Sequence, residues 1–73
     1  MDDLSRRILN EFKELEQNTL DLHALMEAGG NDPESRDRVV DLVAELVRAG
    51  MLEEMGSDYY AITDSGRKAS GQA

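Results

Sequence analysis

The fold is decided by residues 48–66, which read RAGMLEEMGSDYYAITDSG. Within this stretch, residues 51–55 and 59–63 alternate as two short strands, and the second is rich in aromatic and β-branched side chains. Residues 56–58, Gly-Ser-Asp, separate the two runs and are of the kind that tight hairpin turns favour. We therefore predict a β-hairpin. Its first strand and turn carry no lysine or arginine but three acids: Glu53, Glu54 and Asp58.

A first helix is predicted over residues 2–16. Its apolar residues recur every three or four positions and form one stripe along the helix. They are Leu4, Ile8, Phe12 and Leu15. Arg6 and Arg7 each have an acid one helical turn away, so we expect both arginines to be paired with local carboxylates.

Two further helices are predicted before the hairpin. Thr19-Leu20 is a short β-compatible step, after which Asp21 is suited to cap a second helix. Gly29-Gly30 ends that helix, because glycine tolerates the left-handed conformation. A third helix is predicted over residues 33–49, with Asp32 as its cap and a proline at its first position. Its broad apolar arc consists of Val39, Val40, Leu42, Val43, Leu46 and Val47.

The remaining helix-ending and helix-capping residues indicate the limits of the domain. Gly50 ends the third helix, and Thr63-Asp64 is expected to cap a last helical turn after the hairpin, through Ala69. The 73 residues have room for one small domain. We assign residues 1–69 to that domain and predict that residues 70–73 form a flexible tail.

The chain resembles a winged helix-turn-helix domain of the kind found in small prokaryotic transcription regulators. A helix ends in glycine, an apolar step enters a strand, and the return strand reads Tyr-x-Ile-Thr-x-x-Gly. The residues that carry the resemblance are Leu42, Leu46, Gly50, Leu52, Tyr60, Ile62, Thr63 and Gly66. The resemblance covers nearly the whole chain. It implies a mainly α fold in which three helices form the core, a small antiparallel β-hairpin forms the wing, and the helix starting at Pro33 is in the position of the recognition helix.

Charge is the strongest compositional signal. Sixteen acids against eight bases give a formal net charge of −8, and the excess is spread along the chain. Such a surface repels phosphate and anionic lipid at long range. There is no cysteine, and neither a secretory signal nor an apolar run of about 20 residues is present. We therefore expect a cytoplasmic protein without a membrane partner.

The resemblance implies DNA-contacting positions at the exposed start of the third helix, namely Ser35, Arg36 and Arg38. Arg67 and Lys68 follow the hairpin and are the basic pair nearest to it. A small cationic patch is one interpretation of these residues. However, each of the two helix-three arginines has an acid four residues before it. That spacing favours solvated, locally compensated charges over a DNA-binding patch.

The acidic composition has a second explanation. Two lysines against six arginines, with abundant aspartate and glutamate, are also typical of hosts that keep concentrated salt in the cytoplasm. Screening by that salt would blunt the repulsion from DNA. Both explanations stay open at the level of sequence.

Signals for catalysis or metal binding are weak. His23 and Glu27 lie one helical turn apart, but a metal site needs further ligands. Asp64-Ser65-Gly66 lacks the frame of a nucleophilic serine, and Gly29-Gly30 lacks the lysine of a phosphate loop. We expect neither an enzyme nor a cofactor.

A protein-binding surface is the other class of site that the sequence indicates. Leu9 falls about 60° beyond Phe12 on the helical wheel, off the main stripe. Tyr59 and Tyr60 are adjacent, so one of them must face away from the core. The candidate interface residues are Leu9, Glu53, Glu54 and Tyr59.

Two functions follow as hypotheses. The first is a transcription-associated module that binds a protein partner or a second copy of itself and does not bind DNA strongly alone. The second is a DNA-binding regulator, dimeric, that reads DNA through Arg36 and Arg38. The net charge and the acidic hairpin favour the first.

Overall fold

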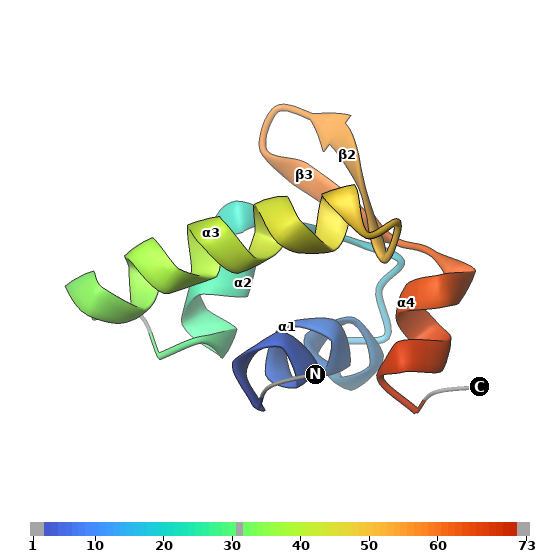
Figure 1. The fold of residues 1–73 in the computed structure, drawn as a ribbon, viewed down its shortest axis with the longest axis horizontal. Coiled ribbons are helices and arrows are strands. Elements are labelled where there is room, and N and C mark those ends of the chain that lie inside the picture. The colour runs from blue at the N-terminus through green and yellow to red at the C-terminus, as the bar shows by residue number, and fades with distance from the viewer. Residues whose placement is uncertain (1–2, 31, 72–73) are drawn as a thin grey trace.

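The structure is a computed structural model that describes residues 3–30 and 32–71. It is mainly helical with one small sheet (Figure 1). The elements are α1 (Asp3–Glu14), β1 (Thr19–Asp21), α2 (Leu22–Ala28), α3 (Pro33–Arg48), β2 (Leu52–Gly56), β3 (Tyr59–Ile62) and α4 (Asp64–Ala69). The β2–β3 hairpin projects from one side of α3, and α1 lies on the other side (Figure 1).

The predicted starts of the second and third helices are confirmed by their caps. The Asp21 carboxylate accepts a hydrogen bond from the backbone N–H of Ala24 at 2.9 Å, and the Asp32 carboxylate accepts one from Ser35 at 2.9 Å. These N–H groups have no partner inside their own helices. The backbone N–H and hydroxyl of Ser35 both donate to Asp32 and hold the pKa of that carboxyl below its ordinary value.

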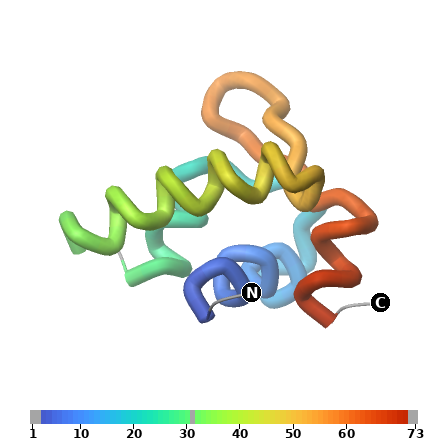
Figure 2. The backbone as a smooth tube through the Cα atoms, viewed as in Figure 1, coloured from blue at the N-terminus to red at the C-terminus, as the bar shows by residue number. Residues whose placement is uncertain are grey.

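The sheet has three strands, so the prediction of a hairpin alone is wrong. The strand order is β1-β3-β2, and both pairs are antiparallel. The chain passes behind α3 between α1 and α2 (Figure 2), and there Thr19 pairs with Ala61 and Asp21 with Tyr59. This third strand covers the outer edge of β3, whose backbone groups would otherwise lack partners.

The hairpin turn is tied to the start of α2. Ser57 and Asp58 have φ values of 52° and 63°, which are typical of a turn that matches the strand twist. The Asp58 carbonyl accepts a hydrogen bond from the N–H of Leu22 at 2.8 Å. The tip of the hairpin is therefore anchored at its turn as well as at its base.

The core is formed by all three strands and by the first three helices. Its buried apolar residues are Ile8, Leu9, Phe12, Leu20, Leu25, Val39, Val43, Leu46, Leu52 and Ile62. Leu9 is 0% exposed, so its prediction as an interface residue is wrong. The physical reason is that α1 contacts α2, α3 and α4, so its buried face is wider than one stripe.

The predicted end of the first helix also needs correction. Helix α1 ends at Glu14. Leu15 is predicted to belong to the apolar stripe of this helix, but it lies beyond the helix end and is 48% exposed. At the start of the predicted tail, Ser70 is half-buried and is the C-cap of α4, and its hydroxyl donates to the Arg67 carbonyl at 3.0 Å. Gly71 is exposed, and the last two residues of the predicted tail, 72 and 73, lie outside the described residues.

Within residues 3–30 and 32–71, every helix is too short or too polar to cross a lipid bilayer.

Candidate interaction surface

The outward face of α3 is acidic. Val39, Val43 and Leu46 face the core. The opposite side of the helix presents exposed acids spaced three or four residues apart, which places them in one row. They are Glu34, Asp37, Asp41 and Glu45, and we call them the α3 acidic face.

Beside this face, α3 and the hairpin enclose a shallow apolar groove of about 260 Å³. Its lining consists of Val40, Ala44 and Val47 from α3 with Glu54 and Tyr60 from the hairpin. Glu54 and Tyr60 are direct partners across β2 and β3. Val40 is 44% exposed, so this residue of the predicted apolar arc faces the groove and not the core. We call this feature the α3–hairpin groove.

Tyr60 connects the groove to the acids around it. Burial of the ring raises the pKa of Tyr60 above its ordinary value of 10.0, and the carboxylates of Glu54 and Asp58 raise it further. Both effects oppose a negative phenolate. The groove therefore has an apolar floor within a negative electrostatic field.

The predicted DNA-contacting residues do not gather on one surface. Arg36 and Arg38 are two positions apart, so they project about 200° apart around α3. Arg38 and the half-buried Ser35 line a cleft against α1. Arg67 and Lys68 belong to α4, which lies at the other end of the molecule from the start of α3 (Figure 1).

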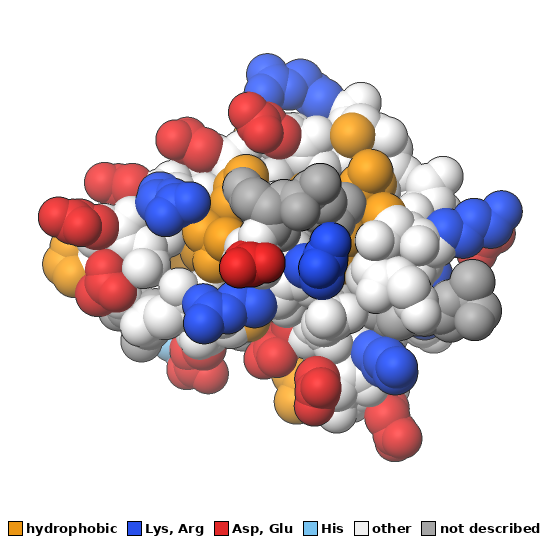
Figure 3. All heavy atoms as spheres, turned by 60° about the horizontal axis from the view of Figure 1, so that its bottom comes forward, with side chains coloured by type: hydrophobic (Ala, Val, Ile, Leu, Met, Phe, Trp, Pro, Cys, Tyr) orange, Lys and Arg blue, Asp and Glu red, His pale blue; other side chains and the backbone are white. Residues whose placement is uncertain are grey.

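Arg67 also has a structural role, because its guanidinium donates a hydrogen bond to the side chain of Asn18. On the face around α1, the blue lysine and arginine side chains lie apart from one another among acidic ones (Figure 3). Because Arg36 and Arg38 lie at the start of α3 and Arg67 and Lys68 lie in α4 at the other end of the molecule, these four described residues form no continuous cationic strip beside the hairpin (Figure 1).

The predicted protein-interface residues divide between two faces of the hairpin. Glu54 lines the α3–hairpin groove. Tyr59 is 47% exposed, which confirms that one of the adjacent tyrosines faces away from the core. Glu53 is exposed and, by the alternation of side chains along a strand, projects from the face opposite Glu54.

The local ion pairs predicted for Arg7 and Arg38 do not form within the described residues. Neither arginine has a carboxylate of residues 3–30 or 32–71 within ion-pair distance. His23 Nε2 and Glu27 Oε1 do form a pair, at 2.9 Å, with both side chains largely exposed. The predicted partner of Arg6, Asp2, lies outside the described residues. No group of three metal-ligating side chains occurs in the described part of the chain.

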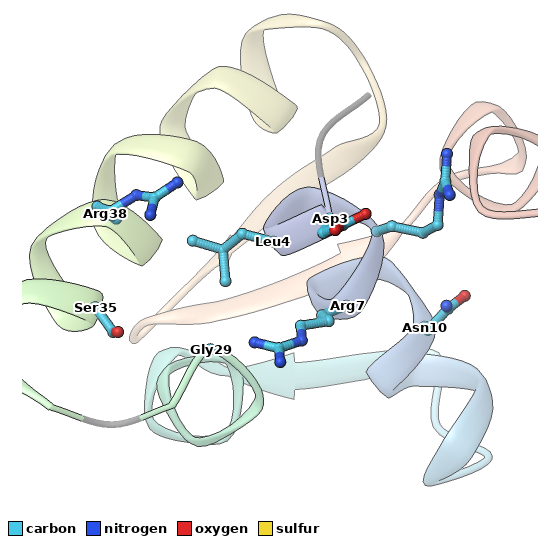
Figure 4. A pocket seen from close by; sticks show the side chains of 8 residues that line it. Asp3, Leu4, Arg7, Asn10, Gly29, Ser35 and Arg38 are labelled. Atoms are coloured by element: carbon cyan, nitrogen blue, oxygen red, sulfur yellow. The ribbon is translucent and has the colours of Figure 1, made fainter.

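A second hollow, the α1–α3 cleft, has a volume of about 510 Å³. Arg7 of α1 and Arg38 of α3 point into it from facing helices, and Leu4 lies between them (Figure 4). Sequence reasoning missed this site because it assigned each arginine to a local acid. Only the packing of α1 against α3 brings the arginines to one cleft.

No protein-family model matches the sequence, and neither a curated protein nor a solved structure gives a significant match.

Proposed function

We propose that this chain is a winged-helix protein that acts in transcription as a protein-interaction module in the cytoplasm and does not bind DNA strongly by itself. The fold assignment is supported by the order helix, strand, helix, helix, hairpin, with β3 between β1 and β2. It is also supported by the Tyr-x-Ile-Thr-x-x-Gly return, which resembles that of winged-helix regulators. In this assignment α3 occupies the position of the recognition helix.

The charge of α3 argues against DNA as the principal ligand. In DNA-binding winged-helix proteins the exposed face of this helix enters the major groove, where phosphates line both walls. In this chain the exposed side of that helix is the α3 acidic face. The nearby hairpin adds three more acids, Glu53, Glu54 and Asp58. Each carboxylate near a phosphate opposes binding, and the counterion release that drives association is lost.

The observation that carries the proposal is the α3–hairpin groove beside the α3 acidic face. An apolar groove with an anionic border is complementary to an amphipathic helix that has lysine or arginine beside its apolar side. We infer that a partner protein supplies such a helix. Its apolar side chains would contact Val40, Val47 and Tyr60, and its cations would lie near Asp41 and Glu54.

A designed peptide can take the place of the partner helix and test this proposal. The probe is a helix of leucine and lysine with leucines on one face, and the control is a scrambled peptide of the same composition. We expect the helical peptide to bind about tenfold more tightly than the scrambled peptide in fluorescence anisotropy, since the groove rewards an apolar face.

Two matched variants locate the binding. Val40→Ser is expected to weaken binding of the helical peptide by about tenfold, a change of roughly 1.4 kcal/mol. Leu15→Ser removes an apolar side chain of similar exposure, 48% against 44%, that does not line the groove. It should leave binding unchanged. Equal effects of the two variants, or equal binding of the scrambled peptide, would contradict the proposal.

The competing function is a DNA-binding regulator, which a separate measurement addresses. Under the proposal, a mixed-sequence duplex is not retarded by the protein in gel electrophoresis at low salt. Tight, salt-sensitive retardation that Arg36→Ala and Arg38→Ala both weaken would instead establish the start of α3 as a DNA-reading element.

A further inference from the structure

The α1–α3 cleft collects cationic side chains in an acidic protein. Arg6 and Arg7 from α1 and Arg38 from α3 line it, together with one acid, Asp3. Half of the six arginines of a chain with net charge −8 thus border a single cleft. The cleft lies on the α1 side of α3, whereas the α3–hairpin groove lies on the other side, so the two sites are independent.

The charges of Arg7 and Arg38 are not compensated within the described residues. Asp3 and Glu11 are one helical turn from Arg7, and Glu34 is one turn from Arg38, yet none of these carboxylates reaches ion-pair distance. Two guanidinium groups that point into one cleft, with no carboxylate of residues 3–30 or 32–71 paired to either, repel each other. An anion between them would remove that repulsion and could accept paired hydrogen bonds from each planar guanidinium.

The floor of the cleft is apolar. Leu4 is half-buried there, and Gly29 lies beside it without a side chain (Figure 4). A Cβ on Gly29 would lie 2.3 Å from Cγ2 of Val39 and 3.3 Å from Cδ1 of Leu4. A glycine is therefore needed here for the end of α2 to pack this closely against Val39 of α3 and Leu4 of α1. The side-chain amide of Asn10 and the hydroxyl of Ser35 add polar groups at the border.

We propose that the α1–α3 cleft binds a small organic anion that has a carboxylate or phosphate head and a short hydrocarbon body. The head lies between the guanidinium groups of Arg7 and Arg38, and the body covers Leu4. A volume of about 510 Å³ is in the range of small-molecule sites and far too small for a nucleic-acid duplex. Because the head contacts both helices, the bound anion joins α1 to α3.

The test uses the full chain and three six-carbon probes at low salt: hexanoate, hexyl phosphate and the uncharged hexanamide. Binding is followed by the NMR shifts of the Leu4 methyl groups and the Gly29 amide, and by the rise in the thermal unfolding midpoint. We expect saturable binding of at least one anion and none of hexanamide. Whichever anion binds more tightly identifies the head group as a carboxylate or a phosphate.

Matched variants separate this site from general charge effects. Arg7→Gln and Arg38→Gln should each weaken anion binding by about tenfold, because each removes a charge-assisted contact. Arg48→Gln removes the same charge from the last turn of α3, outside the cleft, and should change nothing.

Three results would overturn the proposal. Binding of neither anion at millimolar concentration would exclude the site. Equal weakening by Arg48→Gln would show that net charge and not the cleft attracts the anion. Inorganic phosphate that binds as tightly as hexyl phosphate would exclude a contribution from the apolar floor, and with it an organic ligand.

Discussion

At the scale of single residues, Thr63 joins three parts of the chain. Its Oγ1 accepts a hydrogen bond from the N–H of Gly66 at 3.0 Å and donates one to the Gly50 carbonyl at 2.6 Å. Its own N–H donates to the Met51 carbonyl at 3.1 Å. One side chain thus caps α4 and holds the turn after α3. These structural hydrogen bonds account for the threonine in the Tyr-x-Ile-Thr-x-x-Gly motif, so no ligand-binding role is needed to explain it.

Removing this hydroxyl should therefore destabilise the protein. We expect Thr63→Val, which keeps the branched shape, to lower the free energy of unfolding by about 1–2 kcal/mol in urea denaturation, the size of a lost cap. Thr63→Ser keeps the hydroxyl and should change stability far less. Thr19→Val makes the same chemical change at an exposed position of β1 and serves as the control. A loss of equal size in Thr19→Val would contradict the role assigned to Thr63.

Tyr60 gives a prediction about pH. Burial, Glu54 and Asp58 raise the pKa of its phenol above 10.0, so the folded state keeps the proton at a pH where the unfolded state has begun to lose it. This pKa difference stabilises the folded state. The stabilisation is fully present at a pH below the ordinary tyrosine pKa and is lost as the pH rises through the raised pKa of Tyr60.

The measurement uses a chain with one tyrosine. In Tyr59→Phe, the phenolate absorbance reports Tyr60 alone. We expect the midpoint pH of its titration to be higher in the folded protein than in the urea-unfolded chain. Adding Glu54→Gln should lower the midpoint, because a negative neighbour is removed. A midpoint equal to that of the unfolded chain would show that the phenol of Tyr60 is not buried beside these carboxylates.

At the scale of elements, α4 is held against the turn between α3 and β2 by close backbone contact. Gly66 is buried, and a Cβ at this position would lie 2.2 Å from the Met51 carbonyl oxygen and 2.9 Å from Cγ1 of Ile62. Because a backbone atom cannot rotate away, α4 would have to shift to accommodate any side chain.

Gly66→Ala should accordingly destabilise the protein by about 1–3 kcal/mol, the usual range for overpacking, despite the higher helix propensity of alanine. Ser65→Ala is the control, since Ser65 is the preceding residue of the same helix and is exposed. Its effect on the urea midpoint should be within about 0.5 kcal/mol. If the Gly66→Ala protein were as stable as the original chain, the close packing of α4 against Met51 and Ile62 would be refuted.

At the scale of the whole molecule, the distribution of charge decides which ligands are suitable. The α3 acidic face and the hairpin acids cover the surface that a winged-helix protein would turn to DNA, whereas Arg6, Arg7 and Arg38 line the α1–α3 cleft. Total charge alone would treat these two surfaces as equal. The α3–hairpin groove and the α1–α3 cleft lie on different sides of α3, and this separation underlies our proposals of a protein partner for the groove and a small anion for the cleft.

Reversing charges on α3 tests this view of the molecule. Lysines at Asp37, Asp41 and Glu45 take the net charge from −8 to −2, because each of three reversals adds two units. We expect this variant to retard duplex DNA at low salt, since α3 then presents cations to the phosphates. Lysines at the exposed Glu14, Glu16 and Glu27 give the same net charge and should cause no retardation. Equal retardation by both variants would remove the support for α3 in the recognition position.

Sequence by itself determined the elements and most of their ends. Asp21, Asp32 and Thr63 act as the predicted caps, because a side-chain oxygen bonds an N–H only three residues away. The alternation around residues 56–58 likewise predicted the hairpin, since side-chain direction along a strand is a local property.

The short β-compatible step at Thr19-Leu20 was predicted, but tertiary structure alone decided its pairing with β3, the burial of Leu9 and the placement of arginines from two helices in one cleft. Thr19–Asp21 becomes a strand by pairing with residues about 40 positions later, and Leu9 is buried because α1 is covered by three other helices. Arg7 and Arg38 line the same cleft because α1 packs on α3. Such contacts depend on how whole elements are arranged, and local spacing contains no information about that arrangement.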